Sequence, residues 1–160
     1  MTISRRKALQ VAGAAFVLPT ALRAQEGGGT VHEVQMLNRD PETGDTMVYK
    51  PAVLQIEPGD TVRFVPTDPG HNTESTEGGI PEGAEEWSSD INEEFEITLD
   101  AEGPYAYNCR PHNTAGMVGI ILVGQVDSLD PLRELRLRGR AAQRWDDYLA
   151  EAETMMSGDA

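Results

Sequence analysis

The chain has 160 residues, 39% of them hydrophobic, which is enough for one globular domain with an ordinary core. Its formal net charge is −14, with 27 acidic and 13 basic residues. So negative a surface disfavours nucleic acid and anionic membranes as partners. The charge serves either solubility or the attraction of a basic partner, and the arithmetic alone leaves both open.

Residues 1–24 have the pattern of an export signal. The paired Arg5 and Arg6 are followed by a modestly apolar stretch and by a small-residue cleavage site at Ala24. The apolar stretch is shorter than the roughly 20 residues that a membrane span needs. We therefore expect a twin-arginine signal, a flexible lead-in over 25–30, and a soluble periplasmic protein that is not inserted in a membrane.

Short alternating runs separated by turn residues predict an all-β sandwich over residues 31–126. The run 118–123 is apolar almost throughout, so we expect it in the centre of a sheet or covered on both faces. A turn at 57–60 predicts a hairpin-like unit from its two flanking strands. The strands expected from the pattern are 31–37, 52–56, 61–65, 95–99, 105–109 and 118–123.

The segments between these strands are mostly polar or rich in proline and glycine. We expect a polar loop over 38–45 and a long connection over 66–92, with a short helical turn at 81–87. The sequence period changes over 127–160, the expected C-terminal helical extension. Its first helix starts at Asp130-Pro131 and runs to Gly139, and a second amphipathic helix follows, with the apolar stripe of both on the sandwich.

The single cysteine, Cys109, carries the strongest chemical signal. His112 follows it by three residues and Met117 by eight, and His71 lies upstream in a separate loop. In an exported protein, a lone cysteine cannot form an internal disulfide, so it is buried and inert, paired with another chain, or a metal thiolate. Each residue alone has an ordinary structural explanation, but together they predict a metal site.

These four side chains are the ligand types of a mononuclear type 1 copper site. Two imidazoles and a thiolate with a weak axial thioether suit Cu(I) and Cu(II) about equally well, so little has to move when one electron is exchanged. Zinc is the main competitor, but a structural zinc site favours a closed tetrahedron without a thioether. We therefore expect one copper ion held by His71, Cys109, His112 and Met117.

The chain resembles the pseudoazurins, which are cupredoxins of the blue copper class. The resemblance covers nearly the whole mature chain, although residues 115–119 are more similar to the corresponding loop of plastocyanins. It is carried by Val34–Asn38, Met47–Ala52, Pro58–Val62, Gly70–Asn72, Ile80–Glu85, Ile91–Glu93 and Cys109–His112.

This resemblance implies an eight-stranded Greek-key sandwich with two C-terminal α-helices and the same four copper ligands. It further implies that Asn72 braces the loops of His71 and Cys109. The implied function is one-electron transport in the periplasm, with transient docking near His112 to a c-type cytochrome, a copper nitrite reductase or a similar reductase. An apolar patch of Met47, Pro66, Pro111 and Ala115 is the expected docking face, and we expect a monomer.

Several residues depart from the family pattern. Pro69 and Asn108 stand where lysine is frequent, so the sequence does not support a basic docking ring. Gln35 replaces a frequent histidine, and His32 lies three residues earlier. The alternative function is copper binding or delivery, whereas an enzyme is disfavoured because only His32 remains for a further, histidine-rich copper site.

Overall fold

The structure is a computed structural model that describes residues 28–158. The expected twin-arginine signal over 1–24 lies outside the described residues. Eight strands form two four-stranded sheets, as predicted, with the orders β2-β1-β4-β6 and β3-β8-β7-β5. The strands are β1 Val31–Arg39, β2 Thr46–Lys50, β3 Val53–Ile56, β4 Asp60–Val65, β5 Glu74–Ser75, β6 Phe95–Leu99, β7 Gly103–Asn108 and β8 Val118–Val123.

The predicted hairpin between β3 and β4 is wrong, because the turn at 57–60 crosses from one sheet to the other. β3 pairs in parallel with β8, placing Val53 opposite Ile120, and β4 pairs in parallel with β1. The turn residues correctly indicated a chain reversal. However, local turn chemistry does not decide which strand becomes the neighbour, since both strands have an apolar face to bury between the sheets.

Two short strands, β2 and β5, were not predicted from the pattern. The helical turn predicted over 81–87 is also absent, and a single turn stands there, in which Ala84 N–H donates to the carbonyl of Pro81 at 3.1 Å. The conformation of residues 81–87 depends on tertiary packing more than on helix propensity. Trp87 is buried and its ring stacks on Phe64 with centroids 6.4 Å apart.

The core between the two sheets is aromatic near its centre. Tyr107 contacts Tyr49 and Phe64 edge-on, with ring centroids 4.7 Å and 5.2 Å apart. The same buried cluster includes Cys109 and Met117. The candidate ligands therefore rest on a close-packed layer that restricts their movement.

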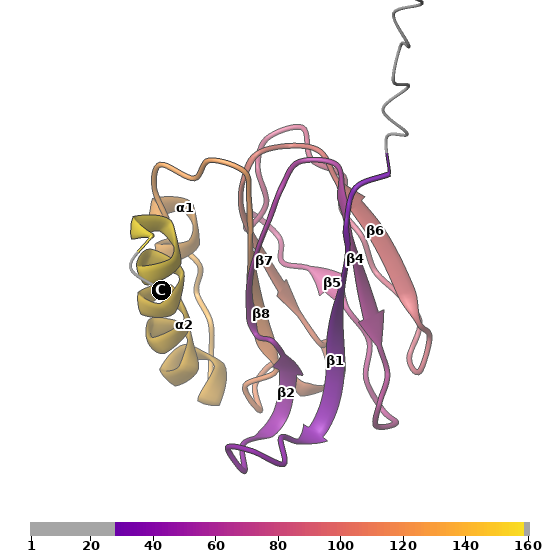
Figure 1. Cartoon of the computed structure of the whole chain (residues 1–160). Coiled ribbons are helices and arrows are strands. Elements are labelled where there is room, and N and C mark those ends of the chain that lie inside the picture. The colour runs from indigo at the N-terminus through magenta and orange to yellow at the C-terminus, as the bar shows by residue number, and fades with distance from the viewer. Residues whose placement is uncertain (1–27, 159–160) are drawn as a thin grey trace, which may run out of the picture.

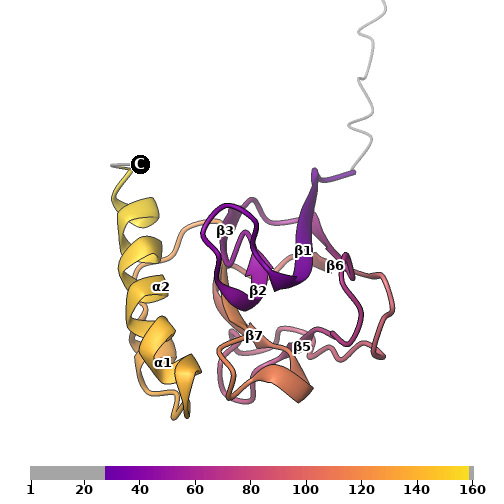
Figure 2. The same cartoon turned by 90° about the horizontal axis from the view of Figure 1, so that it is seen from below.

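The helices form a third layer on one side of the sandwich (Figures 1 and 2). α2 (Arg140–Ser157) matches the predicted second helix, but α1 (Asp130–Arg133) is a single turn, and the chain from 134 to 139 is not helical. A second apolar cluster fills the space between β8 and α2. β8 is consequently buried on both faces and lies between two strands, as predicted.

Leu135 and Leu137 explain the error in the first helix. Their spacing suggested a helical stripe, yet both pack against the second apolar cluster from an irregular segment. Trp145 supports this arrangement, since its Nε1–H donates to the carbonyl of Leu132 at 3.0 Å. Within residues 28–158, no helix has the length and apolar character needed to cross a membrane.

Candidate metal centre

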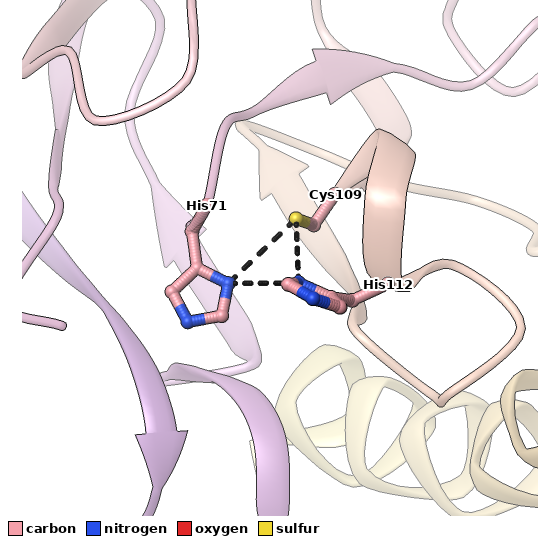
Figure 3. A group of neighbouring side chains, drawn as sticks. All are labelled: His71, Cys109 and His112. Atoms are coloured by element: carbon pink, nitrogen blue, oxygen red, sulfur yellow. Dashed lines mark hydrogen bonds between the residues drawn. The ribbon is translucent and has the colours of Figure 1, made fainter. Parts of the chain in front are cut away.

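Two separate loops bring the candidate ligands together at one end of the sandwich (Figure 3). His71 lies in the connection between β4 and β5. Cys109 directly follows β7, and His112 ends a short 3₁₀ turn, η1 (Arg110–His112). The fold thus joins a residue from one loop with two from another, as the sequence predicted for His71, Cys109 and His112.

The donor atoms of these three side chains form a small triangle. Cys109 Sγ lies 3.8 Å from His71 Nδ1 and 3.6 Å from His112 Nδ1, and the two nitrogens are 3.1 Å apart. A first-row metal ion bonded at roughly 2.0 Å to nitrogen and 2.3 Å to sulfur needs donors separated by about these distances. The triangle therefore fits a single ion, and the thiolate and imidazole donors suit copper.

The loop from Cys109 to Met117 is closed by its own backbone. Cys109 N–H donates to the carbonyl of Met117 at 3.0 Å, and Met117 N–H donates to the carbonyl of His112 at 3.1 Å. Met117 is fully buried, in the same apolar cluster as Cys109. This places its backbone beside the other three residues, while the thioether as a fourth ligand stays a prediction.

His71 is fully buried and is held through its other ring nitrogen. His71 Nε2 lies 3.0 Å from Asn38 Oδ1. An amide oxygen only accepts, so Nε2 carries the proton and Nδ1 presents a lone pair toward Cys109. Burial, and secondly the neighbouring His112, lower the pKa of His71 below 6.5, which further favours the neutral imidazole that a metal requires.

Asn72 joins the two loops of the site, as expected from the family pattern. Its Oδ1 accepts a hydrogen bond from Arg110 N–H at 2.8 Å, and its carbonyl accepts one from the Tyr49 hydroxyl at 2.8 Å. Burial raises the pKa of the Cys109 thiol, and backbone hydrogen bonds from Asn72 and at His112 oppose that rise. Asn72 therefore acts on both the position and the electrostatics of the sulfur.

The site is closed on the protein side and accessible only at one histidine. Cys109 and His71 are fully buried, whereas His112 is partly exposed. The four residues of the expected apolar patch, Met47, Pro66, Pro111 and Ala115, are each partly or fully exposed. Arg110, which lies beside Pro111 of this patch, is paired with Glu74, with Arg110 Nη2 and Glu74 Oε2 2.7 Å apart.

Sequence reasoning missed two residues that act on the site, Asn38 and Arg144. Asn38 lies in a segment that the pattern indicated as a loop, but it belongs to β1 and orients His71. Arg144 is buried on α2 and donates to the carbonyl of Gly116 at 2.8 Å. A signal for it existed, since Arg144 falls on the apolar stripe of Ala141, Trp145 and Leu149, where a charge is unusual.

Comparisons with known proteins also indicate that the chain binds copper. Residues 35–124 match the model of the copper-binding proteins of the plastocyanin/azurin family. A pseudoazurin from Paracoccus pantotrophus is 41% identical over 129 residues, covering 80% of this chain and 88% of that protein.

Solved structures show the same likeness. A pseudoazurin from Sinorhizobium aligns with a TM-score of 0.75 and 41% identity, covering 78% of this chain and 98% of that one. The pseudoazurin of Hyphomicrobium denitrificans aligns with a TM-score of 0.72 and 38% identity, covering 76% and 98%.

Proposed function

Because the chain belongs to the plastocyanin/azurin family of copper-binding proteins, and within it to the pseudoazurins, we propose that it carries single electrons in the periplasm through a copper held by His71, Cys109, His112 and Met117. The protein is a blue copper electron carrier with one type 1 copper ion, and it is not an enzyme.

One observation carries the ligand assignment: the Nδ1 atoms of His71 and His112 and Sγ of Cys109 lie within 3.8 Å of one another. Two imidazoles and a thiolate are otherwise an unusual group to find in mutual contact in a protein interior, because polar groups there normally face complementary partners. Met117 is assigned as the fourth ligand from its place at the end of the same loop and its complete burial.

Bound copper would supply the one-electron Cu(II)/Cu(I) couple. The protein residues keep the donor atoms in one arrangement for both oxidation states. Asn38 fixes the tautomer of His71, Asn72 ties the Cys109 loop to the His71 loop, and the aromatic core supports both from below. Little reorganisation is then needed when an electron arrives or leaves.

We place electron entry and exit at His112, since it is the exposed member of the donor triangle. The surrounding patch of Met47, Pro66, Pro111 and Ala115 offers the small apolar surface that a transient redox encounter uses. A c-type cytochrome and a copper nitrite reductase or similar reductase are the proposed partners. The chain itself acts as a monomer that is exported by the signal in residues 1–24.

The proposal is tested by the visible absorption spectrum of the mature protein loaded with Cu(II), recorded before reduction, after a mild reductant and after reoxidation. An intense thiolate-to-copper band that bleaches and returns supports the carrier. A protein that binds copper without this band, or loses it permanently, is instead a copper-binding or copper-delivery protein. The full burial of Cys109 and His71 favours the first outcome.

The partner proposal has its own test in ionic strength. Electron transfer to a cationic cytochrome should slow steeply as salt rises, because screening weakens attraction to the acidic surface. A rate that does not change with salt would refute electrostatic steering and would leave solubility as the role of the net charge of −14.

A further inference from the structure

We propose that Arg144 is a positioning residue of the metal centre, through which helix α2 holds the end of the copper-binding loop in place. The inference rests on the proposed function, because it concerns the loop that carries Cys109, His112 and Met117. It assigns to the C-terminal helix a role beyond covering β8.

The contacts of the Arg144 guanidinium carry the proposal. Nη1 donates to the carbonyl of Gly116 at 2.8 Å and to that of Met47 at 2.9 Å. Nη2 donates to the carbonyl of Thr46 at 3.0 Å and to Asp45 Oδ1 at 3.1 Å. A single side chain of α2 therefore joins strand β2 to the ligand loop.

A guanidinium is well suited to this junction. Arg144 is only 8% exposed, and a buried charge is tolerated only where hydrogen bonds replace the lost water. The planar fork of arginine presents several N–H groups in fixed directions, so it can serve two segments of backbone at once. An anchor needed only to attach the helix would not have to reach the carbonyl next to a copper ligand.

Gly116 shows how closely the loop and the arginine fit. Its φ is +100°, in the region that favours glycine, and a Cβ built there would lie 2.9 Å from Arg144 Nη1. The next residue is Met117, whose carbonyl accepts the hydrogen bond from Cys109 N–H. A shift of the Gly116 carbonyl would consequently move the backbone of both the thioether and the thiolate ligand.

The start of α2 contacts the copper-binding loop at a second point. Arg140 N–H donates to the carbonyl of Thr114 at 3.0 Å, and Arg140 Nη2 pairs with Asp45 Oδ1 at 2.9 Å. Asp45 thus accepts from both arginines and orients them against β2. The axial ligand and the hydrogen bonds around the sulfur tune the redox potential of such sites, so this frame should influence the potential.

The test compares R144M with the wild type. Methionine keeps much of the apolar bulk and removes the hydrogen bonds. We expect copper affinity, measured by competition with a chelator, to fall about ten-fold, and both the thiolate-to-copper band and the reduction potential to shift. R133M is the matched control, since Arg133 forms an exposed ion pair with Glu153 within the helical layer and should leave all copper properties unchanged.

Two further variants distinguish positioning by the hydrogen bonds of Arg144 from an effect of its charge alone. R144K retains the charge without the fork, and we expect it to shift the band in the direction of R144M. D45A removes the carboxylate that orients Nη2, and we expect a smaller shift of the same sign, which can be measured even if R144M does not fold. Stability of the apo-protein in denaturant is recorded for every variant.

Wild-type spectra and affinity in R144M, or in D45A if R144M is unfolded, would overturn the proposal and leave Arg144 as an anchor of the helix. A wild-type spectrum in R144K alone would attribute the effect to charge and would also overturn positioning. A wild-type protein that shows no thiolate-to-copper band refutes the proposed function before Arg144 is tested.

Discussion

The two ends of the sandwich each hold a histidine beside an oxygen acceptor, but the two acceptors differ in charge. At one end His32 Nε2 lies 2.7 Å from Asp60 Oδ2, and at the other His71 Nε2 lies 3.0 Å from Asn38 Oδ1. His32 and Asn38 belong to the same strand, β1, and are about 20 Å apart along it. One strand therefore contributes to two histidine environments.

The difference lies in what each acceptor favours. The hydrogen bond to His32 is the largest cause that holds the pKa of Asp60 below 3.8, and the same carboxylate accepts from Glu57 N–H at 3.1 Å, so Asp60 stabilises the turn at 57–60. Asn38 carries no charge, so it fixes the tautomer of His71 without favouring protonation. A buried neutral imidazole held in this way presents the lone pair of its other nitrogen to a metal ion. The residue that accepts the hydrogen bond therefore helps to determine whether a histidine can serve as a ligand.

The largest expected effect at the copper end is that of C109S. The serine hydroxyl is a harder donor that stays protonated, so the intense thiolate-to-copper absorption should disappear completely. Visible spectra of the copper-loaded protein check this. H32Q, at the opposite end, should keep the full band, and an intense band in C109S would contradict the assignment of the sulfur as a ligand.

Removal of the acceptor from each histidine tests the comparison directly. N38A should lower copper affinity about ten-fold or more, because the ring of His71 loses the bond that orients it. D60A, which removes the acceptor from His32, should leave the affinity unchanged. Chelator competition measures both, and equal affinities for the two variants would break the distinction between the two ends.

Copper uptake should release a proton from Cys109. Burial raises the pKa of this thiol above 9.0, and the pKa of His71 is lowered, so near pH 8 the thiol is protonated and His71 is neutral. The apparent affinity should rise about ten-fold per pH unit between pH 7 and 8.5. Titration calorimetry in buffers of different ionisation enthalpy counts the protons, and a pH-independent affinity would contradict the buried thiol as ligand.

The smallest effect is expected at Asp60. Its pKa is lowered from 3.8 by the bond to His32, so its stabilisation is complete above pH 3.8 and is lost as the pH falls through the lower folded-state value. D60N should be less stable than the wild type at pH 6, and the difference should shrink on acidification. Denaturant unfolding at several pH values checks this, and a difference that persists undiminished at pH 2 would contradict stabilisation by the ionised Asp60 carboxylate.

The parts of the fold predicted correctly from the sequence are those with strong local signals. β8 is apolar at every position, and α2 has a clear helical stripe, so both were placed correctly. The pairing of β3 with β4 was predicted wrongly, because the residues of a turn do not determine whether the two strands that it connects lie in the same sheet. The first helix was predicted too long because Leu135 and Leu137 meet the second apolar cluster without helical backbone.

The residues of the metal centre show the same contrast between local signals and long-range contacts. Cys109 and His112 could be predicted as neighbours from their spacing, because one short loop closed by its own hydrogen bonds carries both, and Met117, whose thioether stays a predicted ligand, ends the same loop. Asn38 and Arg144 could not be assigned a role, since their contacts join residues 33 and 28 positions apart in the sequence. A polar side chain on a strand or an arginine on a helix acquires such a role only when packing brings it to the loop.

The softness of a donor atom belongs to the side chain itself, so the residue types alone predict copper chemistry from one thiolate, two imidazoles and a thioether in a β-sandwich. The geometry of the site could be known only from the folded protein: which acceptor orients His71, how Asn72 ties two loops, and how α2 reaches Gly116. The distances between donors depend instead on the packing of two sheets and a helix, which no local stretch of sequence specifies.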